Sequence, residues 1–159
     1  MSSTDIDPVI ARIKNRIETV TAVGPVYDHD IYSRDDLADL IVTEISTVPT
    51  LRAWWISGPT MDARLAEQKS QGYQHRWWTY TITGIDGIPE GHDGITTLRG
   101  LALSVSDALD ADRQLNGTCH RTWPTTWPVH PAYRVIAELG AAVAWVQLEK
   151  RVLTLSTPT

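Results

Sequence analysis

The sequence predicts an α+β domain, in which two long amphipathic helices pack on one face of an antiparallel or mixed sheet of four to five strands. Residues 8–21 and 95–112 carry apolar side chains at three- and four-residue steps, the period of a helix with one buried face. Residues 51–56 and 73–84 are rich in Trp, Tyr, Thr and Ile, which favour strands, and residues 118–155 are extended again. Strands that occur in adjacent runs favour antiparallel or mixed pairing in an α+β fold.

The first helix, predicted over residues 8–21, has clear signals at both ends. Asp7 suits the N-cap, and Pro8 suits the first helical position, where its missing N–H costs nothing. A Gly-Pro pair follows the helix and stops it. Its apolar stripe consists of Val9, Ile10, Ile13, Ile17 and Val20. After it we expect a short extended piece at 26–32 and then, behind an S-x-x-D capping box, a shorter helix at 34–45.

Each of the two Trp-rich strands carries a pair of adjacent Trp residues. Side chains alternate between the faces of a strand, so the two rings of a pair must point to opposite faces. In the second strand we expect the even positions in the core and the odd positions outside; the even set is Trp78, Tyr80 and Ile82, and the odd set is Trp77, Thr79 and Thr81. In the first strand, Trp54 and Trp55 compete for the core. The outer rings are expected either to be covered by the domain's own helices and loops or to meet another protein.

A polar segment, residues 58–72, separates the two Trp-rich strands. Gly58-Pro59 is expected to end the first strand. The residues that follow include Asp62, Arg64 and Glu67 and offer little to a core. Long polar connectors between strands of a compact domain are uncommon and are often functional, so this segment is a candidate binding arm.

The second half begins with the helix predicted at 95–112, whose apolar stripe is Ile95, Leu98, Leu101, Val105 and Leu109. Residues 118–127 contain two Trp-Pro pairs, and proline removes a hydrogen-bond donor, so an edge strand or a surface loop is expected there. A half-buried strand follows at 133–139, with Tyr133 and Val135 on its apolar face. The last strand, 141–155, changes the parity of its apolar positions near 149–151, which predicts a bulge or the sheet edge.

Composition limits the function classes. The 159 residues, 42% of them hydrophobic and 21% charged, predict one folded domain over 1–159. A net charge of −5 without a basic run disfavours nucleic acid as the main partner. Cys119 is the single cysteine, which favours a reducing compartment. The polar N-terminus does not resemble a signal peptide, and no apolar run reaches the length of a membrane span, so no membrane association is expected.

Motifs for catalysis or cofactor binding are missing from the sequence. It contains no phosphate-binding glycine loop, no GxSxG and no HExxH. In Asp28-His29-Asp30 the two carboxylates could share one strand face and bind a metal, but nothing else in the local sequence fixes a third ligand. Cys119 and His120 are adjacent, which places them on opposite faces of a strand and disfavours a Cys-His nucleophile pair. We therefore predict no catalytic, metal or cofactor site, and a structural or binding role.

The layout as a whole carries a resemblance. Its features are the N-terminal helix, the exit Gly24-Pro25-Val26-Tyr27-Asp28, the Trp- and Tyr-rich strand pair, the second long helix followed by Asp112 to Gly117, and the strand-rich C-terminus with Val146-Gln147-Leu148-Glu149. In this order the chain resembles the tail terminator, or tail completion, proteins of long-tailed bacteriophages. None of these residues is a signature of that family, so the resemblance is one of pattern over most of the chain.

The resemblance implies an α+β subunit of a ring, expected to be a hexamer, in the phage virion. Such a ring is assembled in the host cytoplasm, caps the tail tube, stops its polymerisation and offers its other face to the neck or head connector. DNA would pass through an acidic ring without specific binding, because like charges repel. The residues expected at contacts between subunits or with the tube are Trp54, Trp55, Trp77, Arg64, Glu67, Lys69 and Tyr73.

Three other readings stay open. A head-tail stopper is a related neck ring protein, for which a small β-barrel is expected instead of helices on a sheet. A small ligand-binding domain or enzyme would be a monomer or dimer with a Trp-lined apolar cavity. A nucleic-acid-binding domain could use Arg76 and Trp77 as a stacking platform, although the acidic balance of the chain disfavours it.

Overall fold

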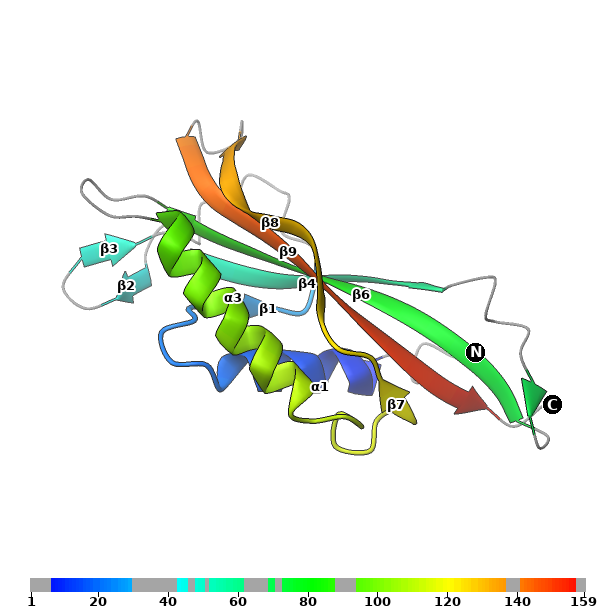
Figure 1. The fold of residues 1–159 in the computed structure, drawn as a ribbon. Helices are drawn as coiled ribbons and strands as arrows, with labels where there is room; N and C mark the ends of the chain where they lie inside the picture. Colours follow the sequence, from blue (N-terminus) through cyan, green and yellow to red (C-terminus); the bar gives the residue numbers. More distant parts are fainter. Residues whose placement is uncertain are drawn as a thin grey trace.

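The computed structural model describes residues 7–29, 43–45, 48–50, 52–61, 69–70, 73–87, 94–136 and 141–156. Two helices, α1 (Asp7–Glu18) and α3 (Gly94–Asp110), lie across one face of a twisted sheet (Figure 1). The predicted α+β class, with both long helices on the same side of the sheet, is confirmed. No helix in the described part of the chain is long and apolar enough to cross a membrane.

The sheet is mixed and has seven strands among the described residues, more than the four to five predicted, with the strand order β1-β4-β6-β9-β7 along its main path. These strands are β1 (Val26–Tyr27), β4 (Arg52–Met61), β6 (Tyr73–Gly87), β9 (Ala141–Ser156) and β7 (Arg121–Thr122). All neighbours are antiparallel except β1, which runs parallel to β4. β9 also pairs with β8 (Thr126–Ile136), and β6 with β5 (Lys69–Ser70). A separate hairpin joins β2 (Thr43–Ile45) to β3 (Val48–Thr50).

The main core fills the space between the helices and the sheet. α1 contributes Val9, Ile13 and Ile17, which are fully buried and lie three to four residues apart, as their periodicity predicts. α3 contributes Leu98, Ala102, Val105 and Leu109. The even positions of β6 complete this core, which confirms the face assigned to Trp78, Tyr80 and Ile82.

The opposite face of the sheet has a smaller apolar cluster of its own, formed by Ala53, Trp55, Ile85, Val143 and Trp145. The Trp55 and Trp145 rings meet edge to face with centroids 5.5 Å apart, and the Arg134 guanidinium lies 4.4 Å above the Trp145 ring. Trp54 packs on the helix side and Trp55 on this second side. The alternation of a strand thus divides this Trp pair between two buried clusters.

Two predicted element boundaries are wrong. β4 does not end at Gly58-Pro59 but continues to Met61, with a shift of its register against β6 between Ser57 and Thr60. A bulge of this kind lets a strand pass a proline that lacks a ladder donor. The predicted helix at 34–45 is contradicted at Thr43–Ile45, which form β2, because their hydrogen bonds go to β3; positions 34–42 lie outside the described residues.

The bulge or sheet edge predicted near residues 149–151 is not found, because β9 is paired with β6 on one side and with β7 on the other in this region. β9 keeps one continuous register with β6 from Val143 to Ser156. Lys150 occupies the helix-facing position between Leu148 and Val152, and it is 1% exposed. A buried lysine therefore interrupts the apolar pattern without interrupting the strand, and the register shifts lie in the neighbouring β8 instead.

Candidate functional site

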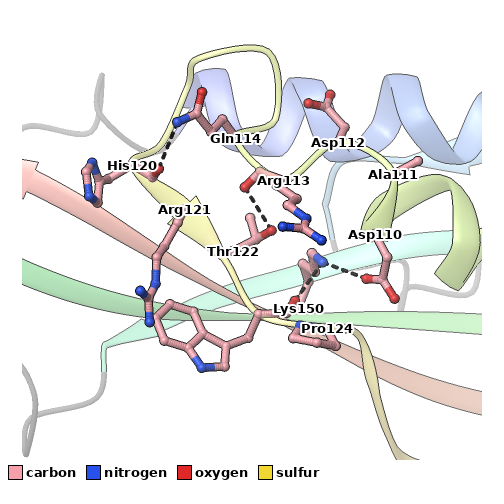
Figure 2. Close-up of a pocket in the computed structure, with 11 residues that line it drawn as sticks. Asp110, Ala111, Asp112, Arg113, Gln114, His120, Arg121, Thr122, Pro124 and Lys150 are labelled. Carbon is pink, nitrogen blue, oxygen red and sulfur yellow. Dashed lines mark hydrogen bonds and ion pairs between the residues drawn. The ribbon is translucent and has the colours of Figure 1, made fainter.

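A groove of about 880 Å³ lies beyond the C-terminal end of α3, beside β7 (Figure 2). Its lining combines charged, polar and aromatic residues: Asp110, Ala111, Asp112, Arg113, Gln114, His120, Arg121, Thr122, Trp123, Pro124 and Lys150. Most of them belong to the turn that follows α3 and to the segment on either side of β7. Two buried or half-buried ion pairs fix the shape of this groove.

The first ion pair joins the end of α3 to β9. Lys150 Nζ donates to Asp110 Oδ1 at 2.7 Å and to the carbonyl oxygen of Trp123 at 2.7 Å. The same Asp110 oxygen accepts the backbone N–H of Thr125 at 2.9 Å and its hydroxyl at 2.8 Å. Burial by itself raises the pKa of the Asp110 carboxyl, but the hydrogen bonds from Lys150 and Thr125 outweigh it, and the pKa is lowered. This network holds the segment between β7 and β8 against the helix end.

The second ion pair holds the turn after α3. Asp112 Oδ2 accepts Arg12 Nε from α1 at 2.9 Å, and its Oδ1 accepts the backbone N–H of Asn116 at 3.0 Å. Burial raises the pKa of the Asp112 carboxyl, yet these bonds lower it overall. Leu115, Asn116 and Gly117 have φ values of 44°, 56° and 78°, so the turn runs through the left-handed region. Asn and Gly tolerate this region, which explains the turn signal in the sequence.

Two cations in the groove have no carboxylate partner within the described part of the chain. Arg113 and Arg121 are both exposed, and neither forms an ion pair among the described residues. The Arg121 guanidinium stacks 4.0 Å from the centroid of the Trp123 ring, and the Trp123 ring meets the Trp77 ring with centroids 4.0 Å apart. Figure 2 shows the Arg113 side chain reaching toward Thr122 and Lys150. The groove can therefore attract an anionic group with two guanidinium groups beside an aromatic wall.

The Trp residues expected at a partner interface lie inside the subunit. Trp54, Trp55 and Trp77 are 0%, 1% and 7% exposed, so the expectation that outer Trp rings are open to a partner is corrected. Trp77 does lie on the face opposite Trp78, but it is buried there and contacts Trp123. The sequence left two possibilities for the outer Trp rings, burial within the domain or contact with another protein, and these three rings are buried within the domain.

The remaining predicted contact residues are placed only in part. Lys69 starts β5 and Tyr73 starts β6, and the two segments pair with each other, but the side chains of both residues lie outside the description. Arg64 and Glu67 lie outside the described residues altogether. Trp54, Trp55 and Trp77 do not line the groove.

An exposed apolar strand edge is the surface that the sequence reasoning missed. Among the described residues, the exposed large apolar side chains are Met61, Leu103, Val129, Tyr133 and Val135, and three of these five belong to β8. β8 pairs with β9 on one side, and within the described chain no strand pairs with its other side. The strand was predicted to bury Tyr133 and Val135, but they are 53% and 73% exposed. Alternation predicts that two residues share a face but not whether anything covers that face.

Metal chemistry finds no support in the described residues, which contain no group of three or more His, Cys, Asp or Glu side chains placed to hold an ion. His29 Nδ1 and Asp28 Oδ1 are 2.9 Å apart, at an exposed position just after β1. The hydrogen bond with His29 lowers the pKa of the Asp28 carboxyl. This pair is a surface contact between neighbouring residues.

Cys119 is expected to react slowly with alkylating reagents in the folded protein. Burial of the thiol, with a further contribution from the negative charge of Asp112, raises its pKa to about 11. At pH 8 the reactive thiolate should then be about a hundredfold less abundant than in the unfolded chain. Iodoacetamide labelling followed by mass spectrometry, with and without denaturing urea, measures the difference. Equal rates in the two states would contradict the burial of this thiol.

Asp110→Ala is expected to destabilise the protein more than Lys150→Met. The side chains of Lys150 and Asp110 are 1% and 37% exposed, so losing the carboxylate leaves a buried charge, whereas losing the ammonium leaves a carboxylate that water can reach. Because the pKa of Asp110 is lowered, its stabilising contribution is present above the ordinary value of 3.8 and is lost as the pH falls through the lowered value. Urea unfolding of both variants at several pH values tests this; an Asp110→Ala deficit that does not shrink in acid would be inconsistent with it.

Comparisons with known proteins do not identify a family or a function for this chain. The sequence matches no protein-family model, and no curated protein gives a significant match to it. What can be said of function therefore rests on the fold, the exposed strand edge, the groove and the layout of the sequence.

Proposed function

We propose that this protein is a structural subunit of a phage virion, a tail terminator that assembles into a ring and caps the tail tube. The observation that carries the proposal is the exposed edge of β8, where Val129, Tyr133 and Val135 present apolar side chains along an open strand. Exposed apolar edge strands pair readily with other chains, and proteins that remain monomeric usually cover or charge them. An edge of this kind supports a role in which another protein chain buries it.

The edge also has features that restrict its pairing. Pro128 and Pro131 lack N–H donors, so the segment that can donate a regular ladder is the part after Pro131. This part, Ala132–Ile136, already keeps a regular register with β9 on its inner side. A ring needs a head-to-tail contact, in which the open segment of β8 meets a different surface of the next copy, and such contacts close into a ring when the rotation between neighbours closes.

In this role the ring, expected to be a hexamer, contacts the tail tube protein on one side and the neck or head connector protein on the other. It is a virion component that is assembled in the host cytoplasm. The net charge of −5 supports free passage of DNA without specific binding. The two helices packed on the sheet support a terminator over a head-tail stopper, for which a small β-barrel is expected.

Electron microscopy of the purified protein, alone and mixed with phage tail tubes, tests the proposal. We expect rings in solution, or caps at one end of the tubes. Tyr133→Asp/Val135→Asp should abolish both, because it places charges on the apolar edge. Leu103→Asp is the control, since Leu103 is similarly exposed, at 54%, but lies on α3. A uniform monomer that ignores the tubes, or a double variant that still forms rings and caps, would refute the proposal.

A second candidate function, a ligand-binding domain, has weaker support from the groove than the structural role has from the strand edge. That reading predicts a cavity lined by apolar Trp side chains. The groove instead has one Trp and five charged residues, Asp110, Asp112, Arg113, Arg121 and Lys150, in its lining. A lining of this kind suits a charged group of another chain better than an apolar small molecule.

A further inference from the structure

We infer that residues 125–131, at the start of β8, form a strap that is latched to α3 and can open while the rest of the sheet stays folded. Residues 132–136, the second part of β8, stay in the sheet and form the fixed end on which the strap turns. The inference goes beyond the ring proposed above and does not depend on it. Three observations carry it: the pairing of β8 with β9, the burial of the strap and its contacts with α3.

The ladder between β8 and β9 is regular only in its second part. Between Thr126 and Ala132, β8 advances six residues. β9 advances only four over the same stretch, from Glu149 to Trp145, so two residues of the strap are extra, and they fall at its two register shifts. Residues 132–136 instead pair one to one with β9. Extra residues at a bulge lack ladder partners, and the two prolines of the strap have no N–H, so few sheet hydrogen bonds hold the strap.

Little of the strap is buried. The side chains from Thr126 to His130 are exposed, apart from Trp127, which is half-buried and packs against the main core. The central strands β6 and β9, by contrast, contribute fully buried side chains to that core, such as Tyr80 and Val146. A segment with few buried contacts and few ladder hydrogen bonds opens at a lower free energy than the core strands. The strap is therefore the part of the sheet that needs another support.

Two contacts with α3 supply that support, and we call them the latch. Trp127 Nε1 donates to the hydroxyl of Ser106 at 3.0 Å, and Ser106 is 8% exposed. Thr125 donates to Asp110 Oδ1 through both its N–H, at 2.9 Å, and its hydroxyl, at 2.8 Å. The accepting carboxylate is itself held by Lys150 Nζ at 2.7 Å. The latch thus consists of side chains of α3 that hold the strap where the ladder to β9 is interrupted.

Opening the latch breaks three hydrogen bonds and exposes one half-buried ring, but it leaves residues 132–136 paired with β9. The strap begins directly after Trp123 and Pro124, which line the groove, so its opening changes one wall of the groove. The exposed side chains of Tyr133 and Val135 keep their place in the sheet. The fold in this way separates a movable wall of the groove from a fixed apolar edge.

Hydrogen exchange measured by mass spectrometry tests the inference on the full-length protein. Ser106→Ala and Thr125→Val each remove one hydroxyl of the latch, and each should speed exchange of the strap amides by about fivefold, the usual contribution of one hydrogen bond. The amides of residues 132–136 and of β6 should exchange as in the unchanged protein. Ser104→Ala is the matched control, because Ser104 is exposed on the same helix and should leave exchange of the strap unchanged.

Low concentrations of urea separate opening of the strap from unfolding of the domain. A local opening exposes little surface, so exchange of the strap should hardly depend on urea, whereas exchange of the core strands through global unfolding should rise with it. A strap that exchanges as slowly as β6 in the unchanged protein overturns the inference. So does exchange in Ser106→Ala that rises equally in the strap, in residues 132–136 and in β6. Strap exchange that neither variant changes also overturns it, because the latch would then not hold the strap.

Discussion

Replacing Asp86 with alanine is expected to lower the free energy of unfolding by about 3–5 kcal/mol, the usual cost of removing one partner of a buried ion pair. Asp86 lies at the end of β6 opposite Arg52, with Arg52 Nε 3.2 Å from Oδ1 and Nη2 3.5 Å from Oδ2. The side chains are 6% exposed for Arg52 and 0% for Asp86. Without the carboxylate, the guanidinium stays buried with an uncompensated charge. Urea unfolding measured by circular dichroism gives the difference.

The double variant Arg52→Met/Asp86→Leu separates the charge from the packing. Removing both charges is expected to recover most of the lost stability, because apolar residues of similar size replace buried pairs at little cost. Arg52 also donates from Nη1 to the carbonyl oxygen of Ala22 at 2.9 Å, which ties the sheet to the turn after α1. Part of the loss should therefore remain in the double variant. An Asp86→Ala protein as stable as the unchanged one would show that the pair is open to water.

Gly84→Ala is expected to destabilise the protein by about 2–3 kcal/mol through overpacking of the core. Gly84 is the cross-strand partner of Trp54, and a Cβ atom built on it would lie 2.6 Å from two atoms of the Trp54 ring and 2.8 Å from a third. The ring is fully buried among core side chains and cannot move aside without disturbing them. Urea unfolding of the purified variant measures the loss.

Gly100→Ala is the matched control, because it adds the same methyl group where nothing lies within 4 Å. Gly100 is exposed in α3, where alanine favours the helix, so this variant should gain about 0.5–1 kcal/mol. The two glycine variants should thus change stability in opposite directions. Loss of stability in both, by similar amounts, would argue against the close approach of Trp54 to Gly84.

Periodicity determined the features of this protein that depend on the backbone alone. The stripe Val9, Ile13 and Ile17 predicted a helix and its buried face, because a helix repeats its face every three to four residues. The alternation of Trp78, Tyr80 and Ile82 predicted the buried face of β6 for the same kind of reason. The turn at Asn116-Gly117 followed from residues that tolerate positive φ. These inferences need only neighbours along the chain.

Tertiary structure decided which faces are covered and which charges meet. From the sequence alone, Lys150 indicated a break in the strand. In the fold its ammonium is buried because Asp110 and the Trp123 carbonyl, from distant parts of the chain, accept its hydrogen bonds. Trp77 was predicted on the outer face, but Trp123 packs on it and buries it. Val135 was predicted on the apolar face of a half-buried strand, but the sheet ends beside it and leaves it exposed. The groove needs the end of α3, β7 and β9 together. A local pattern fixes the direction in which a side chain points, but the free energy of burying it depends on what the rest of the chain places there.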